Sequence, residues 1–103
     1  MKKSKIKTLD VNCLEWFDKI NGNSYFAATI IINYQMKTEK RFILPFQYGY
    51  GDQYRFKAFE KLQKEGYIPK EEKSFWMYCD KNKIITRFTK HENCKKRELK
   101  NIY

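Results

Sequence analysis

The stretch SYFAATIIINY, residues 24–34, constrains the fold of this chain more than any other segment. It consists mostly of β-branched, aromatic and small apolar residues, which is typical of a β-strand buried on at least one face. The dipeptide Asn21-Gly22 precedes it and favours the left-handed conformations that a hairpin turn needs. The chain is therefore predicted to contain a β-sheet, with residues 24–34 as its clearest strand.

The segment before the turn, residues 6–17 (IKTLDVNCLEWF), is ambiguous. In a strand, alternate residues from Val11 to Phe17 share one face. In a helix, Asp10 would cap a face that includes Leu14. We favour the strand, because a hairpin turn and a clear strand follow directly.

An amphipathic helix is predicted over residues 53–65, because an apolar residue recurs at every fourth position from Tyr54 to Leu62. Asp52 is a favoured N-cap residue, and Gly66 lies where a helix commonly ends in a left-handed glycine. Both ends of this helix are therefore predicted by residues of the right type.

Three further segments are predicted as strands: residues 40–46 (KRFILPF), 74–80 (SFWMYCD) and 83–89 (KIITRFT). Pro45 cannot donate to a ladder, so its end of the strand is an edge or an exit of the sheet. The order β-β-β-α-β-β predicts an α+β fold: a single twisted antiparallel sheet of about five strands with one helix packed on one face. Residues 1–103 form a single domain. The basic segment 81–103 is expected to be partly flexible, with a short helix or frayed chain at its end.

The formal net charge of +10 is concentrated at the two ends of the chain. Residues 1–7 hold four lysines and no acidic residue, and residues 81–103 hold eight basic residues against two acidic ones. Residues 8–80 hold ten of each sign and are neutral. This asymmetry indicates a polyanionic partner. The alternative is that the lysines are solvated and serve only to keep the protein soluble.

Cys13, Cys79 and Cys94 lack CxxC spacing, which predicts reduced thiols rather than a disulfide framework. Together with His91, the only histidine, they match no zinc motif, and no local signature of nucleophilic or acid–base catalysis is present. We therefore expect no enzyme, no cofactor and no metal. A cytoplasmic location is expected, because the sequence shows neither a signal-peptide core nor an apolar run of the ~20 residues that a membrane span needs.

The basic C-terminal segment, residues 81–103, carries the strongest functional signal. On a strand, Arg87 shares a face with Ile85 and Thr89, and Phe88 lies among the basic residues. Positive charges beside aromatic rings are how proteins hold single-stranded RNA, although an acidic protein surface would suit the same pattern. We predict partner contacts by Lys81, Lys83, Arg87, Lys90, Lys95, Lys96 and Arg97.

The glycine-tyrosine loop FQYGYGD, residues 46–52, joins the third predicted strand to the helix. Backbone N–H groups before a helix can bind an anion, but Asp52 at the N-cap would occupy those donors and repel phosphate. We therefore predict an architectural turn whose glycines adopt positive φ and whose tyrosines pack down. Tyr48 and Tyr50 are also candidates for stacking on a base or filling a partner's pocket.

The motifs WFDKINGNSYFAA and PFQYGYGDQY resemble those of a family of small uncharacterised proteins of Bacteroidota phages. The resemblance covers roughly residues 9–62 and leaves out the basic C-terminal third. It implies no catalytic residue. This chain is similar in size and character to anti-CRISPR proteins, and Bacteroidota carry RNA-targeting type VI-B systems.

From the residues and this resemblance, we expect a non-enzymatic phage accessory protein acting in the host cytoplasm. It would inhibit a host defence nucleoprotein, foremost a CRISPR RNA-guided nuclease, by binding that protein or its guide RNA. The alternative is a general RNA or single-stranded DNA-binding protein. An enzyme whose site is assembled by the fold around His91 is a third class.

Overall fold

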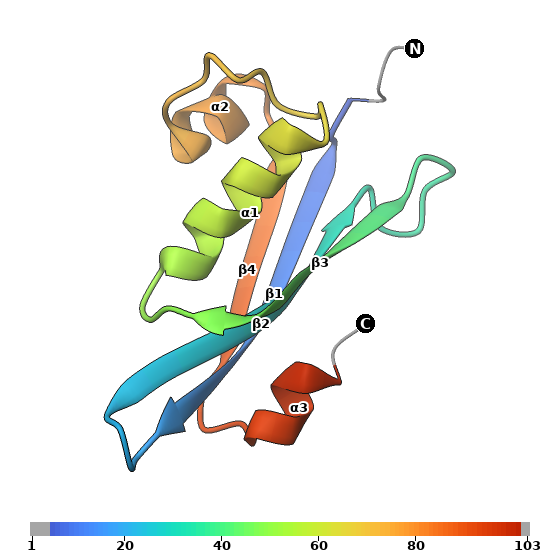
Figure 1. Ribbon diagram of the computed structural model, residues 1–103. Helices are drawn as coiled ribbons and strands as arrows, with labels where there is room; N and C mark the ends of the chain where they lie inside the picture. Colours follow the sequence, from blue (N-terminus) through green and yellow to red (C-terminus); the bar gives the residue numbers. More distant parts are fainter. Residues whose placement is uncertain (1–4, 102–103) are drawn as a thin grey trace.

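Among residues 5–101, which the computed structural model describes, four strands form one mixed sheet (Figure 1). The predicted α+β class is confirmed. In chain order the elements are β1 (Thr8–Asp18), β2 (Asn23–Ile32), β3 (Lys40–Tyr48), α1 (Gln53–Lys64), α2 (Phe75–Lys81), β4 (Ile85–His91) and α3 (Lys96–Lys100). The strand order in the sheet is β3-β2-β1-β4.

The antiparallel hairpin of β1 and β2 forms around the predicted turn, and it pairs Trp16 with Tyr25. Gly22 has a φ of +69°, and its N–H donates to the Asp18 carbonyl at 2.7 Å. The Asn21 side chain donates to the Asp18 carboxylate at 2.8 Å, which lowers the pKa of that carboxyl group. The strand interpretation of residues 6–17 is therefore confirmed.

The prediction of a strand over residues 74–80 is wrong, because this segment begins helix α2. Ser74 caps the helix: its Oγ accepts a backbone N–H of the first turn at 3.2 Å. Phe75, Tyr78 and Cys79 are partly or fully buried and recur at helical spacing. The aromatic content of the segment favours a strand, but the cap and the spacing of the buried side chains produce a helix.

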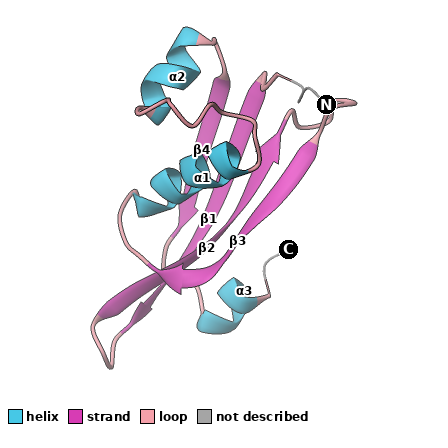
Figure 2. Ribbon diagram, turned by 45° about the horizontal axis from the view of Figure 1, so that its top comes forward, coloured by secondary structure: helices cyan, strands magenta, loops and turns pink. Residues whose placement is uncertain are grey.

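The expected antiparallel sheet of about five strands is also corrected, because β4 pairs with β1 in parallel and the sheet of residues 5–101 has four strands. β3 and β4 lie at opposite edges and run in the same direction. The chain between them crosses one face of the sheet through α1 and α2 (Figures 1 and 2). Such a crossover is the connection that parallel pairing requires. Pro45 lies on β3, which is an edge strand as expected.

The main core lies between α1 and one face of the sheet. Leu9, Val11 and Cys13 of β1 alternate onto this face and are fully buried. The buried side of α1 is as predicted, and Gly66 just beyond the helix has a φ of +84°. The residues that α1 contributes are Tyr54, Ala58, Phe59 and Leu62.

Helix α3 covers part of the opposite face, where it contacts β1, β2 and β3. Leu99 of α3 and Ala27 of β2 are fully buried on this side. Figure 2 shows α1 and α2 together on one side and α3 apart from them. The tail of the basic segment is therefore a short docked helix, one of the two forms expected.

The glycine-tyrosine loop is the strand-to-helix turn that was predicted, but with different details. Gly51 has a φ of +63°, whereas Gly49 is needed for space: a Cβ there would lie 2.5 Å from the ring of Phe26. Asp52 is the N-cap residue of α1, yet its carboxylate accepts no capping hydrogen bond. The expected objection to an anion at this helix end, that the Asp52 side chain occupies the donors, is therefore wrong.

The tyrosines of this loop do not pack down. Tyr48 is 57% exposed and Tyr50 is 67% exposed. The correction follows from the alternation of β3: Tyr48 is opposite Tyr25 and points to the face away from α1, where no helix covers it completely.

Candidate nucleic-acid interface

The fold divides the predicted contact residues between the two ends of the sheet. Lys81 and Lys83 come directly before β4, whereas Lys95 and the two basic residues after it come beyond the end of that strand. Because β3 and β4 run in the same direction, Tyr48 and Tyr50 at the end of β3 lie at the same end as Lys95. The structure thus places the predicted tyrosines and the basic residues 95–97 at the same end of the sheet, after opposite edge strands.

The N-terminal lysines lie at the other end of the sheet. The Ile85 N–H donates to the Lys7 carbonyl at 3.1 Å, which places Lys7 beside the start of β4 and close to Lys83. Lys2 and Lys3 lie outside the described residues. Within residues 5–101, the positive charge of the two terminal regions therefore forms two separate surfaces and not one face.

Arg87, one of the predicted contacts, is held by a carboxylate of the neighbouring strand. Its Nε lies 2.6 Å from Asp10 Oδ1, and its Nη2 donates to Asp10 Oδ2 at 3.0 Å. This forked geometry is the strongest form of an arginine–carboxylate contact. Because Asp10 is mostly buried and Arg87 is largely exposed, the pair anchors β4 to β1 and leaves one side of the guanidinium accessible.

Lys90 is also paired within the fold. Its ammonium lies 3.5 Å from Glu15, 3.7 Å from Glu92 and 3.2 Å from the Gly51 carbonyl oxygen. Desolvation by itself lowers the pKa of Lys90, but the Glu15 and Glu92 carboxylates outweigh it and the net shift is upward. The side chain is half-buried and ties β4 to β1 and to the glycine-tyrosine loop.

An aromatic cluster lies on the sheet face that α3 covers. We define it as Trp16, Tyr25, Phe46 and Tyr48. The rings of Trp16 and Tyr25 stack with centroids 5.5 Å apart, and those of Tyr25 and Phe46 stack at 5.1 Å. Tyr48 meets Tyr25 edge-on at 5.8 Å and is the most exposed member.

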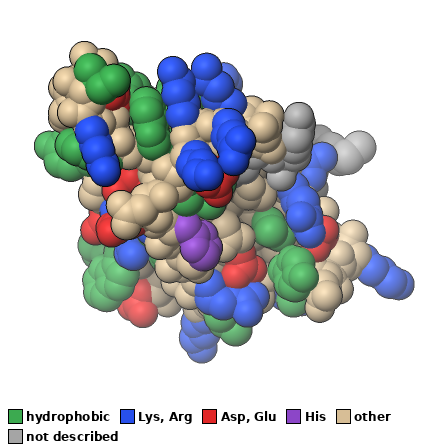
Figure 3. All heavy atoms as spheres, turned by 90° about the horizontal axis from the view of Figure 1, so that it is seen from below, with side chains coloured by type: hydrophobic (Ala, Val, Ile, Leu, Met, Phe, Trp, Pro, Cys, Tyr) green, Lys and Arg blue, Asp and Glu red, His purple; other side chains and the backbone are tan. Residues whose placement is uncertain are grey.

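Basic residues of α3 lie directly on this aromatic cluster. The Lys96 ammonium lies 5.5 Å from the centre of the Trp16 ring, and the Lys100 ammonium lies 5.8 Å from that of Phe46. Lys95 and Arg97, the neighbours of Lys96 in the chain, are exposed. Figure 3, which views this end of the molecule, shows lysine and arginine side chains next to hydrophobic ones. We call Lys95–Lys100 together with the aromatic cluster the α3 surface.

A hollow of about 410 Å³ adjoins the α3 surface between the β1–β2 turn and the start of α3. Trp16 and Phe17 form its apolar wall, and Lys19, Lys95 and Lys96 also line it. Asp18 is the one acidic residue of its lining. The hollow therefore offers flat apolar contact and positive charge within the same space.

Five residues of this surface and its hollow are not predicted from the sequence: Trp16, Lys19, Tyr25, Phe46 and Lys100. One signal was present: Trp16 and Tyr25 lie nearly symmetrically about the Asn21-Gly22 turn, so the hairpin register makes them neighbours. Phe46 joins the surface only because β3 pairs with β2, and Lys100 joins it only because α3 packs back onto the sheet. Neither is visible in the local sequence.

The cysteines are free, and their surroundings keep them protonated. Burial raises the pKa of Cys13 to about 12 and that of Cys79 to about 11. Burial also raises the pKa of Cys94, which is only half-buried. Among the described residues, no three histidine, cysteine or acidic side chains are grouped so that they could hold a metal ion.

No protein-family model matches the chain, and neither a curated protein nor a solved structure shows significant similarity to it. The resemblance to phage proteins therefore stays a prediction. In the described part of the chain, no helix is long and apolar enough to cross a membrane.

Proposed function

We propose that this protein is a non-enzymatic RNA-binding protein that holds single-stranded RNA on its α3 surface. The observation that supports this most is the position of the Lys96 ammonium over the Trp16 ring, at the mouth of an apolar hollow. Single strands are held by cations that follow the phosphates and by rings that stack on the bases. The α3 surface offers both within a few ångströms.

The exposed tyrosines extend the same surface. Tyr48 and Tyr50 are largely exposed, and Tyr48 belongs to the aromatic cluster on which Lys96 and Lys100 lie. A base that stacks on one of these rings contributes about 1–3 kcal/mol. The remaining predicted contacts have smaller roles: Arg87 and Lys90 hold the sheet together, and Lys81 and Lys83 form a separate patch.

Charge reversal tests this proposal. We expect Lys95→Glu/Lys96→Glu/Arg97→Glu to weaken binding to a uridine-rich single-stranded RNA by at least about 100-fold at about 100 mM salt, since a cation at a phosphate contributes strongly there. The wild-type protein should lose affinity steeply with salt, and the variant should show a slope lower by about 2, because each single-strand phosphate contact contributes about 0.7. The thermal transition should be unchanged, since these side chains are exposed.

The matched control is Lys64→Glu/Lys70→Glu/Lys73→Glu. It makes the same change in net charge on exposed lysines at the far end of α1 and in the loop after it. A specific α3 surface predicts that the control keeps affinity within a few-fold. Equal losses in both triple variants would reduce the interaction to overall charge and overturn the proposed surface.

The second candidate function is inhibition of a host defence ribonucleoprotein, foremost an RNA-guided CRISPR nuclease. Exposed apolar side chains far from the α3 surface favour it: Trp76 is 75% exposed and Phe56 is 57% exposed. Large exposed aromatics are typical of protein contacts. An inhibitor of a ribonucleoprotein would bind the RNA with its α3 surface and the protein with this second, apolar surface.

A pull-down from host lysate, with and without RNase, distinguishes the two functions. An inhibitor should retain a stoichiometric defence protein, by direct contact or through RNA that RNase removes. Diverse RNA without a dominant protein would support the general RNA-binding protein instead.

A further inference from the structure

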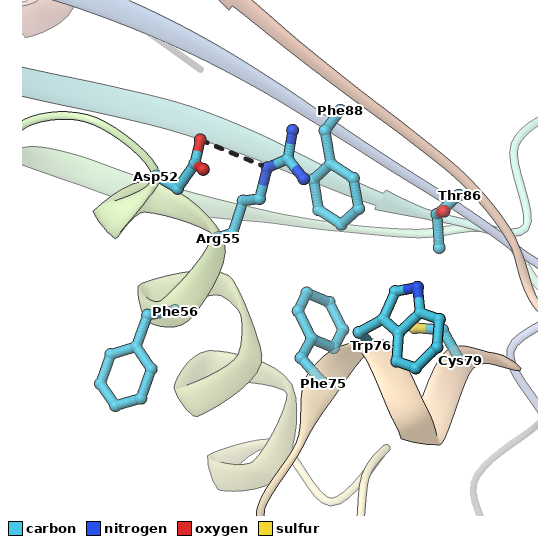
Figure 4. A pocket seen from close by; sticks show the side chains of 8 residues that line it. All are labelled: Asp52, Arg55, Phe56, Phe75, Trp76, Cys79, Thr86 and Phe88. Atoms are coloured by element: carbon cyan, nitrogen blue, oxygen red, sulfur yellow. Dashed lines mark ion pairs between the residues drawn. The ribbon is translucent and has the colours of Figure 1, made fainter. Parts of the chain in front are cut away.

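A second surface lies on the opposite side of the molecule, where an apolar groove of about 310 Å³ runs between α1, α2 and β4. Phe75, Trp76 and Phe88 line it, and Arg55 closes one end with its guanidinium 4.5 Å from the centre of the Phe88 ring. Figure 4 shows these side chains around one space, with Arg55 between Asp52 and Phe88. No residue of the α3 surface lines this groove.

The groove lies beside the outer edge of β4. The Ile85 N–H donates to β1, so the backbone groups of Ile85 and of every second residue after it face β1. Those of Thr86, Phe88 and Lys90 therefore point away from the sheet. Among the described residues, no backbone group pairs with this edge.

Free edges are usually protected by charged side chains, but the cations of β4 do not serve in this way. Arg87 is turned to Asp10, and Lys90 is turned to Glu15 and Gly51. Both contacts draw the side chains toward β1 and the loop and offset their charge. The edge therefore presents unpaired backbone groups, and of its two cations only Arg87 stays largely exposed.

We propose that an extended, acidic segment of a partner protein adds to β4 as a fifth strand and places an apolar side chain in the groove. Strand addition of this kind obtains affinity from main-chain hydrogen bonds and specificity from pockets for alternate side chains. Residues of the added strand on the side of Thr86 and Phe88 face the groove, so every second position should be apolar.

Charge selects the partner. Arg55 in the groove is already paired with Asp52 at 3.7 Å, but Lys81 and Lys83 lie exposed just before β4, and the exposed side of Arg87 lies on the sheet face away from the groove. Acidic residues at the alternate positions would complement these cations. A second copy of this chain is disfavoured as the occupant, because its formal charge of +10 repels its own kind.

A phage-displayed library of random decapeptides, selected on the full protein, provides the probe. The expected consensus alternates aromatic or aliphatic residues with aspartate or glutamate. Hydrogen exchange should slow at the amides of Thr86, Phe88 and Lys90 when a selected peptide binds. The amides of Arg87 and Thr89 already face β1 and should change little.

Two variants at one position test the backbone contact. Thr86→Pro removes an outward N–H without touching the ladder to β1, whereas Thr86→Val keeps the N–H and a similar side-chain volume. We expect the selected peptide to bind at least about tenfold more weakly to Thr86→Pro and within about twofold to Thr86→Val. Trp76→Ala should weaken it about tenfold, since the exposed indole lines the groove. All three variants should keep the wild-type affinity for RNA.

Three results would overturn the inference: no enriched consensus, equal peptide affinity of the proline and valine variants, or exchange protection outside β4. Self-association of the wild-type protein that Thr86→Pro abolishes would assign the edge to a second copy instead. Peptide binding and RNA binding are measured in separate assays. A protein that binds no peptide at β4 can therefore still bind RNA at its α3 surface, and loss of the RNA proposal leaves the β4 proposal intact.

Discussion

Asn33 holds the start of the chain in place. It is fully buried and has a φ of 53°, a left-handed conformation that asparagine tolerates better than most residues. Its Oδ1 accepts from the Lys7 N–H at 2.7 Å, and its Nδ2 donates to the Lys5 carbonyl and to Thr38 Oγ1, both at 2.9 Å. One side chain therefore connects the N-terminal segment with the β2–β3 loop.

We expect Asn33→Ala to lower the free energy of unfolding by about 2–4 kcal/mol, because it leaves buried backbone groups unpaired and strains the left-handed position. Thr38→Val removes only one partner and should cost about 1 kcal/mol or less. Chemical denaturation measures both. An Asn33→Ala protein as stable as the wild type would show that this network contributes nothing.

Lys90 distinguishes a structural cation from a binding one. We expect Lys90→Met to lower the free energy of unfolding by about 1–3 kcal/mol, because Glu15 is left half-buried without its partner. RNA affinity should stay within about twofold of the wild-type value. The double variant Glu15→Gln/Lys90→Met should recover part of the stability. A loss of RNA affinity like that of the α3 triple variant would contradict this assignment.

The two buried cysteines give the protein a defined response to alkali. Their folded pKa values of about 12 and about 11 lie above the ordinary value of 9.0. The folded state thus favours the thiol, so this contribution to stability is complete below about pH 9 and is lost as the pH rises toward 11 and 12. At pH 8 a thiol reagent should modify Cys94 well before Cys13 and Cys79, and mass spectrometry of the digested protein identifies the sites. Equal labelling rates in the folded protein would contradict the burial.

At the scale of elements, the sequence predicts best where the signals are local. The hairpin of β1 and β2 follows from the Asn21-Gly22 turn and β-branched composition, and α1 follows from its periodicity and Gly66. At α2 the sequence wrongly predicts a strand, because Phe75, Trp76 and Tyr78 favour strands by composition and the short length of the helix hides its period. The cap residue Ser74 was the missed signal.

Long-range pairing explains the remaining errors. Nothing in residues 85–91 shows that their partner is β1, because parallel strands are joined by distant contacts and not by a turn. Lys95, Lys96 and Arg97 are predicted from the clustering of charge in the sequence, whereas Lys19 and Lys100 are not. Of the aromatic cluster only Tyr48 is predicted, since the cluster assembles only when three strands pair and α3 docks.

Docking of α3 depends on one buried side chain. We expect Leu99→Ala either to release α3 from the sheet or, where the helix stays docked, to lower the free energy of unfolding by about 2–3 kcal/mol. RNA affinity should then fall at least about fivefold although no charge is removed, because the lysines lose their position over the aromatic cluster. Fluorescence anisotropy with the same RNA measures this. Unchanged affinity in a variant with α3 released would mean that the basic residues act without the fold.

At the scale of the whole molecule, the charge asymmetry of the sequence becomes a division of surfaces. One end of the sheet carries Lys5, Lys7 and Lys83, and the other carries the α3 surface. The groove and free edge of β4 lie on a third side. A partner that contains both RNA and protein can contact the α3 surface and the β4 edge at once, since they do not share residues.

Mapping where RNA touches the protein tests the central claim most directly. Ultraviolet crosslinking of the wild-type protein to uridine-rich single-stranded RNA, followed by mass spectrometry of the digest, identifies the residues in contact with bases. We expect crosslinks at Trp16, Tyr48 or Tyr50 that disappear in the Lys95→Glu/Lys96→Glu/Arg97→Glu variant. Crosslinks confined to Phe56 and Trp76 would place the RNA in the groove and contradict the α3 surface.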